Sequence, residues 1–150
     1  YCSKAEAQGH LDVIDQAYPQ ISRYMRRLTR EALDEGYITN KYDRKLVIPP
    51  ERAYTSVNYM IQGTAADMMK VSMLNCSRWL KQNGIEGSLV MTIHDEIVFE
   101  IADKWFTPET LKGLKFHMEN HEQFVGVPME VGIKQAKERW NEYEDLEFSL

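Results

Sequence analysis

The sequence predicts an α+β domain in which an antiparallel sheet, including a carboxylate-tipped β-hairpin, packs on long helices. Apolar residues recur at helical spacing in 11–33 and again in 54–82. β-branched and apolar residues then dominate 88–101, on both sides of a short polar break. At 150 residues, with 43% hydrophobic and 27% charged residues, the chain has the size and composition of one globular domain. We therefore expect residues 1–150 to form a single unit.

The first two predicted elements are helices separated by a proline. Apolar residues in 11–17 follow helical spacing, and Tyr18-Pro19 interrupts them because the residue before a proline disfavours helix. Pro19 suits the first position of a second helix, whose apolar stripe continues until Gly36. Gly36 is therefore the predicted C-cap of the second helix.

A short hairpin and a long helix follow. Residues 37–48 alternate loosely around turn-forming Asn40 and Asp43, and Pro49-Pro50 ends the pairing. The longest periodic stretch, 54–82, predicts one long, mostly buried helix that ends at Asn83-Gly84. Its predicted buried face holds Ile61, Ala65, Met68, Met69, Ser72, Cys76, Trp79 and Leu80.

The remaining elements are a second hairpin, a helix and a strand. Residues 88–93 and 97–101 read as strands, with the polar break His94-Asp95-Glu96 between them. Thr107 before Pro108 predicts the N-cap of a helix that runs to about Glu122. Residues 128–133 predict a last short strand, and the pattern assigns no element to 138–150.

Composition narrows the function classes. No apolar run approaches the roughly 20 residues that span a bilayer, so no membrane partner is expected. Cys2 and Cys76 lie far apart in no CxxC spacing, which favours a reducing, cytoplasmic compartment. The net charge of -5 argues against nucleic-acid binding, yet residues 1–94 carry +2 and residues 95–150 carry -7. The basic cluster in 23–52 could meet phosphates or form a solvated helix face.

The acidic pair Asp95-Glu96 is the strongest chemical signal. Two adjacent carboxylates in a tight turn repel each other, and each raises the cost of ionising the other. A divalent cation removes that cost, because Mg²⁺ prefers oxygen ligands and often takes one or two carboxylates together with substrate phosphates. The alternative is a solvated acidic turn, since Asp and Glu are common in turns.

Two motifs in a fixed order resemble those of family A (polymerase I-like) DNA polymerases. They are residues 62–67, Gln-Gly-Thr-Ala-Ala-Asp, at the head of the long helix, and His94-Asp95-Glu96 in the hairpin. The resemblance extends to Tyr18-Pro19, to the first hairpin and to residues 128–132. It implies the C-terminal portion of a palm domain with a palm-type sheet, and a cytoplasmic enzyme of a bacterium or a virus-infected cell.

The resemblance assigns roles to the acidic turn. Asp95 matches the palm aspartate that ligates both catalytic Mg²⁺ ions of the two-metal scheme. Glu96 matches the adjacent acid that supports the metal site less directly. His94 matches a histidine near the primer terminus, and its alternative role is that of a turn histidine satisfied by nearby backbone. The implied reaction is template-directed nucleotidyl transfer from deoxynucleoside triphosphates.

Three further positions match residues that bind DNA in the family. Asn58 and Gln62 lie four residues apart on one helix face, and the resemblance implies that they hydrogen-bond the minor groove of the primer-template. The alternative is that both amides cap or bridge within the helix. Arg44 resembles an arginine that contacts duplex backbone, while Gly63, Ala65 and Ala66 are expected to serve close packing.

The sequence also departs from the family pattern. Tyr54 replaces an arginine eight residues before Gln62, Asp43 replaces the glycine of the first hairpin, and the Gly-x-x-x-Trp ending is stretched between Gly132 and Trp140. The other palm motif, with the second metal-binding aspartate, and the fingers helix are expected upstream of residue 1. We therefore expect the 150-residue chain to need that missing N-terminal part as a partner and to be inactive alone.

Three alternatives stay open at this point. The chain could be a non-catalytic DNA-binding module that retains the palm surface, or a metal-dependent nuclease, although only one carboxylate pair is visible. His117 and His121, spaced i, i+4, could bind zinc, although a solvated helix face explains them as well.

Overall fold

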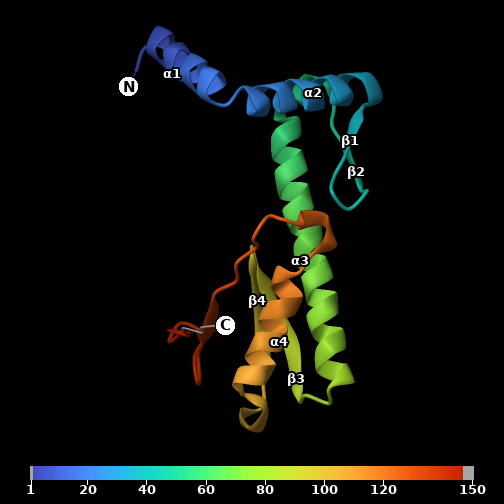
Figure 1. The fold of residues 1–150 in the computed structure, drawn as a ribbon, viewed down its shortest axis with the longest axis vertical. Helices are drawn as coiled ribbons and strands as arrows, with labels where there is room; N and C mark the ends of the chain where they lie inside the picture. The colour runs from blue at the N-terminus through green and yellow to red at the C-terminus, as the bar shows by residue number, and fades with distance from the viewer. Residues whose placement is uncertain (1, 147–150) are drawn as a thin grey trace. The chain divides into compact units, whose positions relative to one another are not determined.

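The computed structural model describes residues 2–146 and divides the chain into two compact units. Unit 1 is Tyr1–Thr64 and unit 2 is Ala65–Leu150, and each has a hydrophobic core of its own. The boundary lies inside one continuous helix, α3 (Ser56–Gln82), where no linker composition marks it. For this reason the sequence indicated one unit. Helices combine with small antiparallel sheets in both units, which confirms the α+β class (Figure 1).

Unit 1 begins with two helices, α1 (Lys4–Ala17) and α2 (Pro19–Glu35). The helix α1 starts earlier than its apolar pattern predicts because Ser3 and Glu6 form a capping box, in which each side chain accepts a hydrogen bond from the other residue's backbone N–H. The predicted start and end of α2 are confirmed: Pro19 is at the first position, and Gly36 is the C-cap with φ of +75°. The sequence-based pattern therefore located α2 correctly and α1 only in part.

The first hairpin closes the core of unit 1. Its strands β1 (Tyr37–Thr39) and β2 (Lys45–Val47) are antiparallel, and the 3-10 helix η1 (Pro50–Thr55) leads into α3. The core is formed by α2, this hairpin, η1 and the first turns of α3, with the buried residues Leu28, Ala32, Ile38, Ile48, Ala53 and Met60. Figure 1 shows the hairpin joined to the end of α2.

Only one face of α3 is buried, so the expectation of a mostly buried helix is wrong for its first half. Ile61 is 62% exposed and Ala65 is exposed, whereas Met60 and Thr64 are buried. In the second half the predicted face is confirmed, because Ser72, Cys76 and Leu80 are buried at intervals of four residues. The buried residues of both halves thus recur at intervals of four, and in the first half the prediction is displaced by one residue, with Ile61 and Ala65 in place of Met60 and Thr64.

Unit 2 contains the second hairpin, β3 (Gly87–Ile93) and β4 (Glu96–Ile101), followed by η2 (Asp103–Trp105). The strands are antiparallel, and a β-bulge at Val90 offsets their register between Leu89 and Met91. Phe99 and Ile101, on the same face of β4, pack on a core whose buried residues are Cys76, Leu80 and Leu114. The hairpin is therefore anchored at its open end.

The helix α4 (Pro108–Glu119) covers the second half of α3 and the hairpin (Figure 1). Thr107 caps it as predicted, accepting from the N–H of Thr110 at 3.3 Å. A Cβ on Gly113 would lie 2.1 Å from the nearest atom of the Trp79 ring, so glycine is what lets α4 approach α3 this closely. The helix ends three residues before the predicted end at Glu122.

The C-terminal segment differs most from the sequence-based prediction. The 3-10 helix η3 (Glu122–Phe124) follows α4, and the predicted strand at 128–133 is wrong because the strand β5 covers Ile133–Gln135. β5 pairs antiparallel with β6 (Glu144–Leu146), which lies in the region 138–150 where the sequence pattern predicts no element. Residues 147–150 of that region lie outside the described residues. Instead of one sheet, residues 2–146 contain three separate two-stranded sheets.

None of the helices within residues 2–146 combines the length and apolar character that crossing a membrane requires.

Candidate active site and DNA-binding residues

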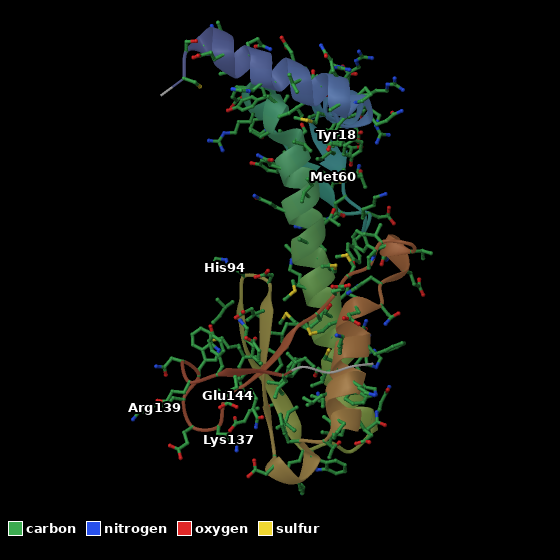
Figure 2. All side chains as sticks on the ribbon, turned by 60° about the vertical axis from the view of Figure 1, so that its left-hand side comes forward. Tyr18, Met60, His94, Lys137, Arg139 and Glu144 are labelled. Carbon is green, nitrogen blue, oxygen red and sulfur yellow. The ribbon has the colours of Figure 1, made fainter. Side chains whose placement is uncertain are left out.

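The acidic turn lies at the free end of the β3–β4 hairpin. Ile93 pairs with Glu96, so His94-Asp95 form a two-residue connection and Glu96 is the first residue of β4. The polar break is therefore one residue shorter than predicted. Figure 2 shows His94 at this end of the hairpin. All three side chains from His94 to Glu96 are exposed.

His94 has a left-handed backbone conformation, with φ of +51°. Few residues other than glycine adopt this region, although histidine does so more often than most. The left-handed conformation costs roughly 1–2 kcal/mol for a residue with a side chain. The tight turn that it allows brings Ile93 opposite Glu96 and presents the acidic pair to solvent. His94 thus has a local structural role whether or not it also contacts DNA.

The two carboxylates of the acidic pair have different surroundings. The Glu96 Oε1 accepts a hydrogen bond from the Lys134 Nζ at 3.4 Å, and the two side chains are 49% and 45% exposed. Asp95 has no ion pair among residues 2–146, and its carboxylate remains open to solvent. Of the two carboxylates, Glu96 is therefore paired with a cation, whereas Asp95 makes no ion pair among the described residues.

Lys134 is held from two sides. Its Nζ lies 4.6 Å from the centroid of the Tyr143 ring, in a cation–π contact, in addition to its bond to Glu96. The pKa of Lys134 is raised, first by attraction to the Tyr143 phenolate and then by the hydrogen bond and charge of Glu96. Lys134 therefore brings a positive charge to the acidic turn.

The donor atoms of the turn suit a hard divalent cation, but they are few. Asp95 and Glu96 offer exposed carboxylate oxygens, which are the ligands that Mg²⁺ prefers. Within residues 2–146, no group of three or more His, Cys, Asp or Glu side chains is placed to hold one metal ion. The turn therefore fits one side of a magnesium site and cannot by itself enclose the ion.

Asn58 and Gln62, on the exposed face of α3, belong to unit 1. One helical turn separates them, so their amides project from the same face. Among the described residues neither amide makes a hydrogen bond to the protein, which removes the alternative that they cap or bridge the helix. Both amides can therefore serve an external ligand.

Arg44 lies next to the same stretch of α3. Its Nη2 donates to the Gly63 carbonyl at 3.4 Å, one residue after Gln62. The turn that carries Arg44 is held by buried Asn40, whose Oδ1 accepts from the N–H groups of Tyr42 and Arg44 at 2.9 and 3.0 Å. The Asn40 Nδ2 donates to the same Gly63 carbonyl at 3.2 Å. Arg44 thus contacts the backbone of α3 directly after Gln62, within unit 1.

Gly63 lets the first hairpin approach α3 closely. A Cβ on Gly63 would lie 2.7 Å from the Leu46 Cδ1, which confirms the expectation that Gly63 serves close packing. Ala65 and Ala66 are exposed, so that expectation is wrong for them in this structure. Asp43 has φ of +59°, the conformation for which the family pattern has glycine. The departure at Asp43 therefore changes the residue but keeps the backbone shape.

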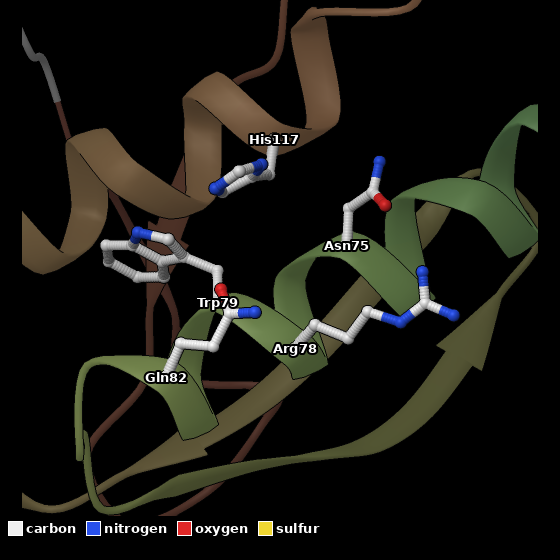
Figure 3. A pocket seen from close by; sticks show the side chains of 5 residues that line it. All are labelled: Asn75, Arg78, Trp79, Gln82 and His117. Atoms are coloured by element: carbon white, nitrogen blue, oxygen red, sulfur yellow. The ribbon is translucent and has the colours of Figure 1, made fainter.

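The two histidines that could have bound zinc are separated by the end of α4. His117 lies on α4, where its ring centroid is 5.8 Å from that of Trp79. His121 follows the helix and is buried, with its Nε2 3.0 Å from the Ser72 hydroxyl. The zinc hypothesis is not supported, and the solvated-face interpretation is wrong for His121. A cavity of about 270 Å³ beside His117 is lined by Asn75, Arg78, Trp79, Gln82 and His117 (Figure 3).

Comparison with known proteins identifies the family. The family model described as DNA polymerase family A matches residues 1–142, and the chain belongs to this family. The structure also resembles the POL domain of Pol1 from M. smegmatis, solved in complex with DNA primer-template and dNTP. The TM-score is 0.71 at 26% identity, over 78% of this chain and 22% of that one.

Curated relatives are polymerases of bacteria and phages. DNA polymerase I of Pseudomonas aeruginosa is 30% identical over 110 residues, which are 67% of this chain and 12% of the relative. The DNA polymerase of Mycobacterium phage D29 is 39% identical over 92 residues, which are 61% of this chain and 14% of the relative. The chain therefore spans only about an eighth of the length of these relatives.

Sequence reasoning missed two residues that organise these sites. The pattern marks Asn40 only as a turn former, although its amide holds the turn around Arg44. No pattern marks Lys134, because it lies 38 residues after Glu96 in a segment whose fold the sequence does not predict. A buried amide in a turn could have suggested the first role, whereas the second had no signal in the sequence.

Proposed function

We propose that this chain is the part of a DNA-directed DNA polymerase that supplies one metal-binding carboxylate and part of the primer-template surface for nucleotidyl transfer. Membership of DNA polymerase family A supports the class of reaction. The observation that carries the proposal is the exposed Asp95, without an ion pair among the described residues, at the end of a hairpin anchored in a hydrophobic core. An accessible carboxylate whose oxygens are not engaged by a cation can accept a metal ion directly.

Each site residue receives one role in the proposal. Asp95 is the Mg²⁺ ligand, and Glu96 supports the acidic turn next to it. Bound Mg²⁺ would supply charge stabilisation for the attacking and leaving oxygens of the transferred phosphoryl group. His94 places the primer backbone, Asn58 and Gln62 hydrogen-bond the minor groove, and Arg44 meets the duplex backbone. Amides suit a copying enzyme because minor-groove acceptors barely distinguish the base pairs.

The catalytic site in this chain is incomplete under the proposal. Residues 2–146 offer no third carboxylate near the acidic pair, whereas a two-metal site needs ligands on both ions. A second aspartate from the remaining part of the polymerase would complete it. Primer-template and deoxynucleoside triphosphates are the proposed substrates, and that remaining part is the proposed partner.

The direct test transplants this segment into an active relative. We would replace the matching segment of the M. smegmatis POL domain with residues 1–142 and measure primer extension, using only a chimera that extends primers. Asp95→Ala should lower kcat by at least about 10³-fold, a loss of roughly 4 kcal/mol in transition-state stabilisation, while primer-template affinity changes little. Asp103→Ala, at another exposed aspartate of unit 2, is the matched control and should leave kcat unchanged.

Three outcomes would contradict parts of the proposal. Full activity of the Asp95→Ala chimera would remove Asp95 from the metal site. Primer extension by the isolated 150-residue chain would overturn the incompleteness of its site. Tight, salt-sensitive duplex binding by the isolated chain, together with unimpaired Asp95→Ala chimeras, would favour the non-catalytic DNA-binding module instead.

A further inference from the structure

Lys134 connects the last described sheet to the acidic turn. It is the central residue of β5, opposite Asp145 of β6, and its Nζ reaches the Glu96 Oε1 at 3.4 Å. The Tyr143 ring lies on the other side of the ammonium group, with its centroid at 4.6 Å. Among residues 2–146, this is the one cation that forms an ion pair with either carboxylate of the turn. The contact joins segments that are 38 residues apart.

The position of this cation makes the two carboxylates unequal. Adjacent carboxylates repel each other, and a cation beside one of them offsets part of that repulsion. The ammonium group of Lys134 contacts the Glu96 carboxylate, whereas the Asp95 carboxylate makes no ion pair among residues 2–146. A divalent cation that approaches the turn then finds one committed and one open carboxylate.

We propose that Lys134 is a positioning residue that keeps Glu96 out of the metal coordination sphere, so that Asp95 alone serves as the metal ligand of this turn. The proposal rests on the proposed function, because it assumes that the turn binds a divalent cation. The proposed function already gives the two acids different roles, and the new step is to assign the cause of that difference to Lys134 of the C-terminal sheet. The price of this arrangement is weaker cation binding, since the ammonium group repels the metal.

Removal of the Lys134 charge therefore has an effect with a definite sign. In Lys134→Met, Glu96 is released and the repulsion of the incoming cation disappears. We expect the affinity of the turn for Mn²⁺, used as a paramagnetic probe in place of Mg²⁺, to rise by about two- to fivefold at low ionic strength. A purely structural role of Lys134 predicts a less stable β5–β6 sheet with no gain in affinity.

The experiment is a titration of the 150-residue chain with Mn²⁺. The readout at each Mn²⁺ concentration is the NMR line broadening of the backbone amides of residues 93–97. Wild type, Lys134→Met and Lys134→Arg are compared. Lys134→Arg should have the same Mn²⁺ affinity as wild type, because arginine keeps the positive charge. The matched control is Lys104→Met, which removes an exposed cation that pairs with Glu86, at the opposite end of the hairpin. This control should leave Mn²⁺ affinity at the turn unchanged.

A second comparison keeps the test decisive if Lys134→Met fails to fold. Glu96→Gln should change Mn²⁺ affinity by less than about threefold, whereas Asp95→Asn should lower it more than tenfold. In the Lys134→Met background, Glu96→Gln should reduce the gain, because the released carboxylate supplies part of it. An equal loss for both acid variants in the wild-type background would overturn the division of labour.

Failure of the inference and failure of the proposed function give different results. If Asp95→Ala leaves the kcat of the chimeric polymerase unchanged, Asp95 is not a metal ligand and the proposed function fails. If wild type binds Mn²⁺ through Asp95 but Lys134→Met shows no gain in affinity, only the role of Lys134 is wrong.

Discussion

The two hairpins of the molecule, β1–β2 and β3–β4, have turns with similar backbone conformations but different side-chain surroundings. Each has a non-glycine residue in the left-handed region, Asp43 in β1–β2 and His94 in β3–β4. In the first turn, Asn40 accepts from two backbone N–H groups and donates to the carbonyl of Gly63. In the second, the side chains of 94–96 are exposed and the ion pair of Glu96 with Lys134 is the contact that the structure gives them. The side chain of Asn40 fixes the backbone of the first turn, whereas the side chains of the second turn are exposed and can contact a ligand.

The largest expected effect is the loss of the Asn40 amide. Asn40→Ala leaves the N–H groups of Tyr42 and Arg44 without their acceptor in a part-buried turn. We expect the free energy of unfolding of unit 1 to fall by about 3 kcal/mol, measured by urea denaturation. Asn120→Ala, which removes one exposed bond to the Phe116 carbonyl, is the control and should cost less than about 1 kcal/mol. Equal losses in the two variants would show that Asn40 does not hold the turn.

The left-handed residues come next. Valine at position 43 or 94 has a β-branched side chain that resists positive φ, so Asp43→Val and His94→Val should each cost about 1–2 kcal/mol. Asp43→Gly and His94→Gly are the matched controls and should keep wild-type stability or gain slightly. In the chimeric polymerase, His94→Gly should still raise the KM for primer-template, whereas Asp43→Gly should not. Equal KM values for the two glycine variants would leave His94 with its turn role alone.

Cys76 offers a readout for unit 2 in these experiments. Its side chain is fully buried, and burial raises the pKa of the thiol to about 11, whereas Cys2 is exposed. Because the thiolate is the reactive form, a thiol reagent at pH 8 should label Cys2 quickly and Cys76 only when the core opens. We expect His94→Val to speed the labelling of Cys76 several-fold and His94→Gly not to do so. Rapid labelling of Cys76 in wild type would contradict its buried position.

The smallest effect on stability is expected at the acidic turn itself. Asp95→Asn removes an exposed carboxylate that has no ion pair among the described residues, so the free energy of unfolding should change by less than about 0.5 kcal/mol. The same substitution should abolish selective Mn²⁺ broadening at residues 93–97. A stability loss of more than about 1 kcal/mol would mean that Asp95 supports the hairpin rather than a ligand.

The sequence predicted those elements whose signals are local. Pro19 and Gly36 bound α2, and Thr107 with Pro108 starts α4, because each acts on its own backbone. The prediction failed where distant groups decide. Residues 128–132 have an extended pattern, but the Val131 N–H donates to the Glu119 carboxylate at 2.8 Å and so is not available to a partner strand. The acidic β6 has low strand propensity and forms only because β5 pairs with it.

The candidate site shows the same difference between features set by adjacent residues and features set by distant ones. The assignments of Asp95 and Gln62 rest on motifs of adjacent residues that carry the family resemblance, and they stay predictions. The unequal surroundings of Asp95 and Glu96 could not be predicted, since Lys134 reaches Glu96 from a distant segment. The end of α4 was also missed, because His121 leaves the helix to meet Ser72 in the interior of unit 2.

The β-bulge at Val90 sets a rule for changing the length of the second hairpin. Side chains of a strand alternate between two faces, and this single extra residue fixes which face each residue between Met91 and the turn occupies. To keep the carboxylates on the same face, two residues would have to be added to each strand beyond the bulge. Each such addition would move the turn outward by about 7 Å. One unmatched insertion would instead point the carboxylates to the opposite side. The reach of the acidic turn is therefore adjustable in fixed steps.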